Sequence, residues 1–140
     1  MTGIVAVIGP TAIGKTKLSV EIATECGGEI INADSRQVYR LMDIGTAKPT
    51  AEERKQAIHH LLDIRDPHET YSLGSFVSAA SDVINNNERN DIPSILCGGS
   101  GQYVWGLLEG WNVPAIPPNQ PFRLQKECEA ERDGNVALHE

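Results

Sequence analysis

An eight-residue loop with two glycines, set between an apolar strand and a helix, restricts the fold of this chain more than any other segment. Residues 3–8 form an uninterrupted apolar, β-branched run, which is typical of a strand covered on both faces in a parallel sheet. The residues that follow match the pattern G-x-x-x-x-G-K-[ST]. They are Gly9, Pro10, Thr11, Ala12, Ile13, Gly14, Lys15 and Thr16.

This pattern predicts a phosphate-binding loop. The glycines permit a tight turn whose backbone N–H groups converge on a phosphate, and the start of the following helix adds its positive dipole end. Lys15 can contact the outer phosphate oxygens, and the Thr16 hydroxyl can bind Mg²⁺. The alternative is a structural turn with an exposed lysine, and the flanking strand and helix disfavour it. The loop recognises a diphosphate group and leaves open what that group is attached to.

The apolar runs and glycine stops along the rest of the chain predict an α/β fold with a P-loop NTPase-like parallel sheet flanked by helices. A helix over 15–26, a stop at Gly27-Gly28 and a strand over 29–32 make a βαβ crossover. We expect further strands at 61–64 and 93–97, and further helices at 50–59, 75–87 and 100–109.

Composition indicates one globular core followed by a different kind of segment. The 140 residues are 40% hydrophobic and 22% charged, which suits a single domain. Residues 1–113 are expected to form the P-loop core. Residues 114–140 are expected to be a proline-rich linker, with Pro114, Pro117, Pro118 and Pro121, and then the start of a charged helix.

Charge, apolar run length and cysteine content indicate the expected cellular compartment and the kinds of partner. The net charge of −7 disfavours a strongly basic nucleic-acid domain, although a local basic site is compatible with it. No apolar run approaches the roughly 20 residues needed to cross a bilayer. Three widely spaced cysteines form no C-x-x-C pair, so we expect reduced thiols and a cytoplasmic protein without a membrane partner.

Two further loops follow predicted strands and are candidates for the rest of a site. Carboxyl ends of neighbouring parallel strands share one crevice, so Asp34 is placed to act beside bound phosphates as a general base or a metal-linked acceptor. A helix cap is the alternative role for Asp34. After the strand at 93–97, residues 98–101 read GGSG, and Ser100 either faces a ligand or caps a helix.

Four motifs together resemble the tRNA dimethylallyltransferase family. They are GPTAIGKT at 9–16, DSRQVY at 34–39, DIGTAKP at 43–49 and GGSGQY at 98–103, and the resemblance extends to about Arg123. The family usually has Thr where this chain has Ser100. Its members are longer, so the resemblance implies an N-terminal portion that lacks a further pyrophosphate-contacting arginine and much of the tRNA-binding surface. Such a portion could be inactive alone.

The resemblance implies a reaction. The family transfers a dimethylallyl group from dimethylallyl diphosphate to the exocyclic amine of the adenosine beside the anticodon, and releases diphosphate. By matching position, Asp34 is the catalytic base. Lys15, Ser100, the loop and Mg²⁺ stabilise the leaving diphosphate.

The resemblance also implies where tRNA binds. The matching positions are Asp34, Ser35, Arg36, Gln37, Ser100 and Arg123. Gln37 could satisfy an adenine edge with a paired donor and acceptor. The adenosine must leave its stack to reach a buried site, and the full-length protein is expected to be a monomer.

Three other functions stay open. A small-molecule kinase would bind ATP in the same loop and use Asp34 to activate a hydroxyl. A related enzyme would add the same group to free adenine nucleotides. A phosphate-binding fragment would bind without turnover.

Overall fold

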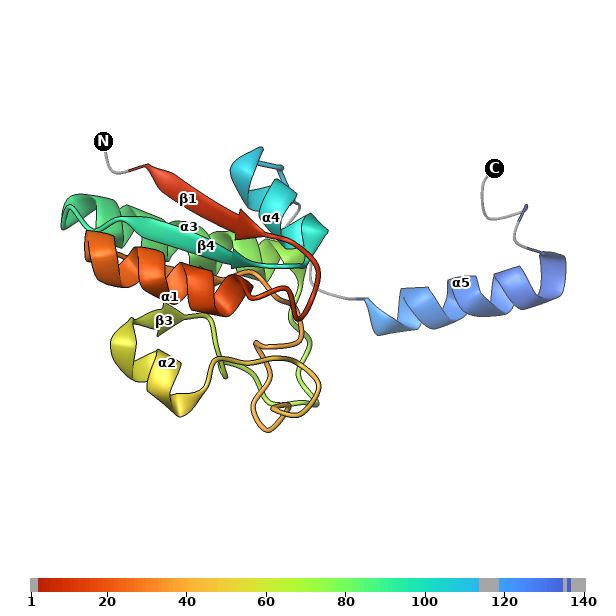
Figure 1. The fold of residues 1–140 in the computed structure, drawn as a ribbon. Coiled ribbons are helices and arrows are strands. Elements are labelled where there is room, and N and C mark those ends of the chain that lie inside the picture. The colour runs from red at the N-terminus through yellow and green to blue at the C-terminus, as the bar shows by residue number, and fades with distance from the viewer. Residues whose placement is uncertain (1–2, 114–118, 135, 137–140) are drawn as a thin grey trace.

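The computed structural model describes residues 3–113, 119–134 and 136, and it holds a parallel sheet with helices on both faces (Figure 1). The strands are β1 (Ile4–Ile8), β2 (Glu29–Asn32), β3 (His59–His60) and β4 (Ser94–Gly98). The helices are α1 (Lys15–Cys26), α2 (Ala51–Gln56), α3 (Leu73–Arg89), α4 (Gly101–Leu108) and α5 (Gln120–Asp133). The predicted fold class is confirmed.

The sheet has the order β1-β4-β2-β3, with every pairing parallel. β4 lies between β1 and β2, so that Ile95 is level with both Val5 and Ile30. This register brings the carboxyl ends of β1, β2 and β4 to the same edge of the sheet. The loops that follow these three strands carry the phosphate loop, Asp34 and Ser100.

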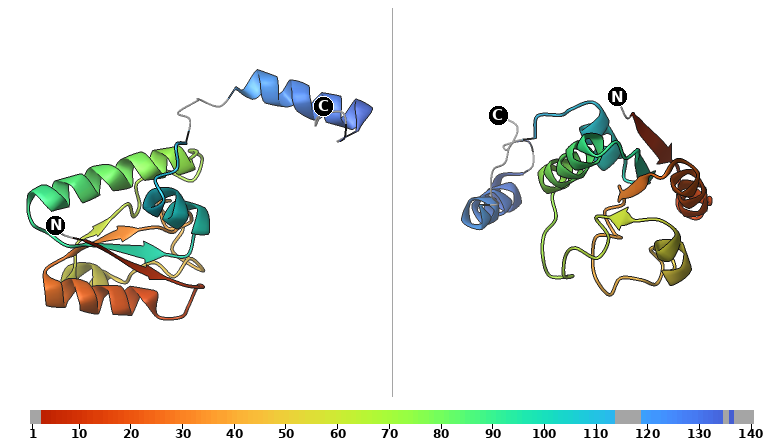
Figure 2. Two further views of the ribbon diagram at one scale, coloured as in Figure 1. Left: turned by 90° about the horizontal axis from the view of Figure 1, so that it is seen from above. Right: turned by 90° about the vertical axis from the view of Figure 1, so that its left-hand side faces the viewer.

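Alternate side chains of β2 and β4 are buried against different helices, one layer on each face (Figure 2). On one face, Ile30 and Ile95 pack with Val20 and Ala23 of α1. Leu18 of the same helix is 49% exposed, so the buried face of α1 is centred on Val20 and Ala23.

On the other face, Ile31 and Leu96 pack with α3 and α4. The fully buried ring of Phe76 stacks on Tyr103, with ring centroids 4.3 Å apart. Burying one such side chain contributes about 1.5–3 kcal/mol. Burial also raises the pKa of Tyr103 to about 12, so its phenol stays protonated and serves packing.

The expected strand at 61–64 is wrong. The strand on this side of the sheet is β3, and Leu61 and Asp63 adopt left-handed backbone with φ of 61° and 54°. Extended strands do not tolerate that conformation, and the short apolar run of residues 61–64 did not reveal it. The helix expected over 50–59 is also shorter, because α2 ends at Gln56 and Ala57 is extended.

The C-terminal segment differs from the core. A helix was expected there, and α5 is present with Pro121 in its first turn and no buried residue. The predicted linker falls largely on residues 114–118, which lie outside the described residues, so the division at 113/114 stays a prediction. Among the described residues, no helix is both long and apolar enough to cross a bilayer.

Candidate active site

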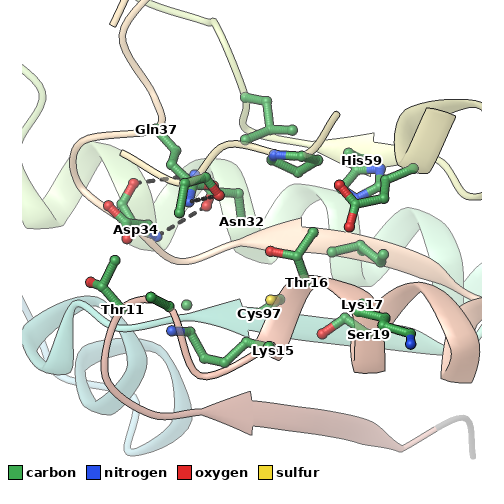
Figure 3. A pocket seen from close by; sticks show the side chains of 18 residues that line it. Thr11, Lys15, Thr16, Lys17, Ser19, Asn32, Asp34, Gln37, His59 and Cys97 are labelled. Carbon is green, nitrogen blue, oxygen red and sulfur yellow. Dashed lines mark hydrogen bonds between the residues drawn. The ribbon is translucent and has the colours of Figure 1, made fainter. Parts of the chain in front are cut away.

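A pocket of about 250 Å³ opens where the three strands end (Figure 3). Its phosphate-loop wall consists of Thr11, Ala12, Gly14, Lys15 and Thr16. Its opposite wall consists of Asn32, Asp34, Gln37, Ala47 and Pro49. Two segments that the sequence analysis predicted separately therefore face one another across a single space.

The phosphate-loop wall has the backbone that the motif requires. Ala12 and Gly14 are left-handed, with φ of 66° and 93°, and α1 begins at Lys15. The Lys15 ammonium donates a hydrogen bond to the Pro10 carbonyl across 2.7 Å, within its own loop. A bound diphosphate would offer this ammonium a charged acceptor in place of a neutral one. Gly9, Pro10 and Ile13 shape the turn without lining the pocket.

Asp34 is held just beyond the carboxyl end of β2 by hydrogen bonds with Asn32. The Asn32 amide group donates to the Asp34 and Leu61 carbonyls, and the Asn32 oxygen accepts from the Asp34 backbone N–H. Asp34 Oδ1 accepts from the Arg36 N–H at 2.9 Å, as in an Asx turn. Residues 35–38 form turns and not a helix, so the alternative role of Asp34 as a helix cap is wrong. Asp34 lines the pocket.

The orientation of the Gln37 side-chain amide is set by backbone carbonyls of residues 46 and 47. Its Nε2 donates to the Thr46 and Ala47 carbonyls at 2.9 and 3.2 Å. Two carbonyl acceptors fix which end of the amide carries the nitrogen. With both N–H groups used in this way, Gln37 offers the pocket an acceptor oxygen. The expected donor–acceptor pair for an adenine edge is therefore wrong for this conformation.

Ser100 and Ser35 bind each other at the rim. The Ser100 hydroxyl accepts from the Ser35 N–H at 2.8 Å and donates to the Ser35 hydroxyl at 3.1 Å. Ser100 takes the N-cap position of α4 without a side-chain capping bond, so that alternative is not realised. Neither serine lines the pocket, and a contact of Ser100 with diphosphate stays a prediction.

The two predicted arginines lie outside the pocket. Arg36 is exposed, beside Asp34. Arg123 lies on α5, and its Nε donates to Glu127. Their roles in tRNA binding stay predictions.

Three residues that line the pocket were not among the predicted site residues. Asn32 is 4% exposed, and its only signal is a polar residue at the end of an apolar strand. His59 lines the pocket with its Nδ1 bonded to the Ala57 carbonyl. Burial lowers the pKa of His59, so the ring is neutral at pH 7. Burial raises the pKa of the pocket thiol Cys97, which disfavours a thiolate nucleophile.

The residues present fit a magnesium ion that is shared with a ligand. Among the described residues, no three histidine, cysteine or acidic side chains gather into a metal site. Mg²⁺ commonly takes one or two protein ligands together with substrate phosphates and waters. The partly buried Thr16 hydroxyl, beside Lys15 in the pocket, meets that need.

Comparison with known proteins follows the same motifs. The family model described as IPP transferase matches residues 37–140, which is most of the chain. The chain belongs to the IPP transferase family. The match begins within the DSRQVY segment and includes DIGTAKP and GGSGQY, so the resemblance inferred from these motifs is confirmed.

Curated relatives agree with this family assignment. A tRNA dimethylallyltransferase of Chloroflexus aurantiacus is 50% identical over 140 residues, covering 99% of this chain and 47% of the relative. One from Thermomicrobium roseum is 49% identical over 137 residues, covering 97% of this chain and 41% of the relative. The chain thus spans less than half the length of the IPP transferases it matches here.

Solved structures share the fold. The full-length tRNA isopentenylpyrophosphate transferase from Bacillus halodurans superposes with a TM-score of 0.78 at 42% identity, covering 99% of this chain and 46% of that one. A eukaryotic dimethylallyltransferase acting on tRNA gives a TM-score of 0.71 at 33% identity, covering 81% of this chain and 28% of that one.

Proposed function

We propose that this chain carries the donor and acceptor pocket of a tRNA dimethylallyltransferase. The reaction moves a dimethylallyl group from dimethylallyl diphosphate to N6 of the adenosine adjacent to the anticodon and releases diphosphate. One observation carries the proposal. Lys15 and Thr16 line the same pocket as Asp34 and Gln37, so that a phosphate cradle faces a carboxylate and an amide oxygen.

The phosphate-loop wall would hold the leaving group. The backbone N–H groups at the start of α1 and the Lys15 ammonium would bind the diphosphate oxygens, where negative charge grows as the allylic C–O bond breaks. Thr16 would bind a magnesium ion, which neutralises part of that charge when it is bound.

The opposite wall would hold the acceptor. Asp34 would take one proton from the adenine amine while the N6–carbon bond forms, and the electron pair of the breaking C–O bond leaves with diphosphate. The amine is a weak nucleophile because its lone pair is delocalised into the ring, so removal of that proton assists attack. The Gln37 oxygen would accept the second N6–H, which suits the orientation set by Thr46 and Ala47.

Binding of the rest of the RNA is part of the same proposal. Ser35 and Arg36 lie beside Asp34 at the rim, where the nucleotides flanking an extruded base would pass. Ser100 fixes Ser35, and Arg123 offers a positive group on α5. We further propose a cytoplasmic monomer, in keeping with a tRNA substrate.

A transfer assay tests the proposal. This chain, extended with the C-terminal half of the Chloroflexus aurantiacus relative, is incubated with an unmodified anticodon stem-loop, labelled dimethylallyl diphosphate and Mg²⁺. Label is expected in the adenosine beside the anticodon, and not in an RNA with guanosine at that position. Label in free adenine nucleotides instead, or phosphate transfer from ATP in parallel reactions, would contradict the proposal.

A further inference from the structure

Lys48 is a buried lysine behind the opposite wall whose ammonium group is fully occupied. Its side chain is 3% exposed. Nζ lies 2.6 Å from the Tyr39 carbonyl, 2.8 Å from Asp43 Oδ1 and 2.7 Å from Asp63 Oδ1. An ammonium has three N–H donors, and three acceptors surround this one. Lysine is rarely buried unless it is paired, and the three acceptors around Nζ supply that pairing for Lys48.

The charges around Lys48 form one connected group. Asp63 Oδ2 also accepts from Arg54 Nη1 at 2.7 Å. Burial opposes the charge on Lys48, but the bonds to Asp43 and Asp63 outweigh it and raise the pKa of the lysine. Burial likewise opposes the charge on Asp63, yet Lys48 and Arg54 lower the pKa of that carboxyl. Both groups are therefore ionised at neutral pH, and the contact is a salt bridge.

This group joins two segments of unfavourable backbone. Ala47 and Asp63 are non-glycine residues in the left-handed region, with φ of 51° and 54°. Such conformations each cost on the order of a kilocalorie or more, and they persist where surrounding contacts hold them. Lys48 directly follows Ala47 and bonds to Asp63, so a single side chain ties both.

The same two segments hold Gln37 from both sides. The Thr46 and Ala47 carbonyls accept from the Gln37 side-chain amide. The Asp63 backbone N–H donates to the Gln37 carbonyl at 3.3 Å. Lys48 itself does not line the pocket, whereas its neighbours Ala47 and Pro49 do.

We propose that Lys48 is a positioning residue that presets Gln37 as a hydrogen-bond acceptor for the base and takes no part in binding diphosphate. The identity of that base rests on the proposed function. The effect of Lys48 on the orientation of Gln37 does not depend on which base binds. The phosphate loop belongs to a different segment, and no bond of Lys48 reaches it among the described residues.

The test measures Gln37 directly in the 140-residue chain. Hydrogen exchange of the Gln37 side-chain amide is followed by NMR in wild type, Lys48→Met, Lys48→Arg and the exposed-lysine control Lys55→Met. Loss of the Lys48 hydrogen bonds should speed exchange of the Gln37 side-chain amide about tenfold in Lys48→Met, which corresponds to the free energy of about one hydrogen bond. Lys48→Arg, which keeps the charge, should recover part of the protection, and Lys55→Met should match wild type.

A binding measurement separates positioning from general support of the fold. Affinity for pyrophosphate with Mg²⁺ should stay within about twofold of wild type in every variant, because the phosphate loop is held by other contacts. Unchanged Gln37 exchange in folded Lys48→Met would overturn the proposal. An equal loss of pyrophosphate affinity would also overturn it. If Lys48→Met does not fold, Asp43→Ala decides, since it removes one bond from an exposed partner and should speed exchange in the same direction.

Failure of the proposed function is distinguishable from failure of this inference. In the transfer assay, Lys48→Met should raise KM for the RNA about tenfold and leave KM for dimethylallyl diphosphate unchanged. A wild-type protein that transfers nothing would contradict the proposed function, while the Gln37 exchange rates would still decide the role of Lys48.

Discussion

Residues 11–14 of the phosphate loop are exposed, whereas Asn32 on the opposite wall is 4% exposed and its amide donates to the Leu61 carbonyl, 29 positions away. The side chain of Lys15 bonds within its own loop. Those of Asn32, Gln37 and Lys48 each bridge separate segments. The phosphate-loop wall therefore has side chains free to bond to a ligand, whereas the side chains of the opposite wall are already fixed by bonds within the protein. Substitutions at Asp34, Lys15, Gly98 and His59 test this difference between the two walls.

Asp34→Asn should separate binding from chemistry on the opposite wall. The amide keeps the shape of the side chain but cannot accept the amine proton. In the extended protein, the transfer rate should therefore fall by about 10²- to 10⁴-fold. Pyrophosphate affinity, which depends on the other wall, should stay unchanged. Unaltered transfer would reduce Asp34 to its bond with the Arg36 N–H.

Lys15→Ala should have the opposite signature. A bond from an ammonium to a charged acceptor contributes about 1.5–3 kcal/mol, so pyrophosphate affinity should fall about 10- to 100-fold by calorimetry. The fold should be retained, because Lys15 lies at the start of α1 and its recorded bond is to the exposed Pro10. Lys55→Ala is the matched control. Equal affinities for Lys15→Ala and wild type would show that the loop does not bind diphosphate.

Gly98→Ala tests the junction at which the two walls meet. A methyl group at this position would run into the Ala33 backbone, 2.8 Å from its Cα, where β4 passes β2. Overpacking of this kind costs about 1–3 kcal/mol, so the urea midpoint should drop. At Gly101 the nearest atom to such a methyl group is Trp105 Cδ1 at 4.0 Å, so Gly101→Ala should leave the midpoint nearly unchanged. Equal midpoints for the two variants would contradict the packing described.

His59 should give the smallest effect, visible in the pH dependence of stability. Its pKa is lowered in the folded protein by burial, so the unfolded chain binds a proton more readily than the folded one does. That part of the stability is present above the ordinary histidine value of 6.5 and is lost as the pH falls below it. His59→Gln should flatten the change in melting temperature between about pH 7.5 and 5.5. His68→Gln, at an exposed position, should not.

The structure of the phosphate-loop wall could be predicted from a short stretch of sequence. The spacing of Gly9, Gly14 and Lys15 is a contiguous pattern with one backbone solution, and α1 begins where that pattern requires. The short apolar runs of β2 and β4 also predicted strands. The longer apolar run of β1 predicted a strand covered on both faces, and this expectation is wrong, because Ile4, Val5 and Ile8 are exposed at the edge of the sheet.

The opposite wall depends on contacts that no local window contains. The orientation of Gln37 follows from carbonyls nine and ten residues away, and the burial of Lys48 from Asp63, fifteen residues away. The left-handed backbone at Leu61 and Asp63 replaced an expected strand because these long-range bonds hold it. Sequence motifs located Asp34 and Gln37, whereas the direction in which Gln37 points is a property of the folded chain.

We propose that the phosphate loop binds an allyl diphosphate that faces Asp34 and Gln37. A calorimetric titration of this chain with dimethylallyl diphosphate and Mg²⁺, repeated in the presence of ATP at about tenfold excess, tests this proposal. We expect saturable binding of dimethylallyl diphosphate that weakens about 10- to 100-fold in Lys15→Ala and is barely displaced by ATP. Tighter binding of ATP, or binding of dimethylallyl diphosphate that ignores Lys15, would contradict it.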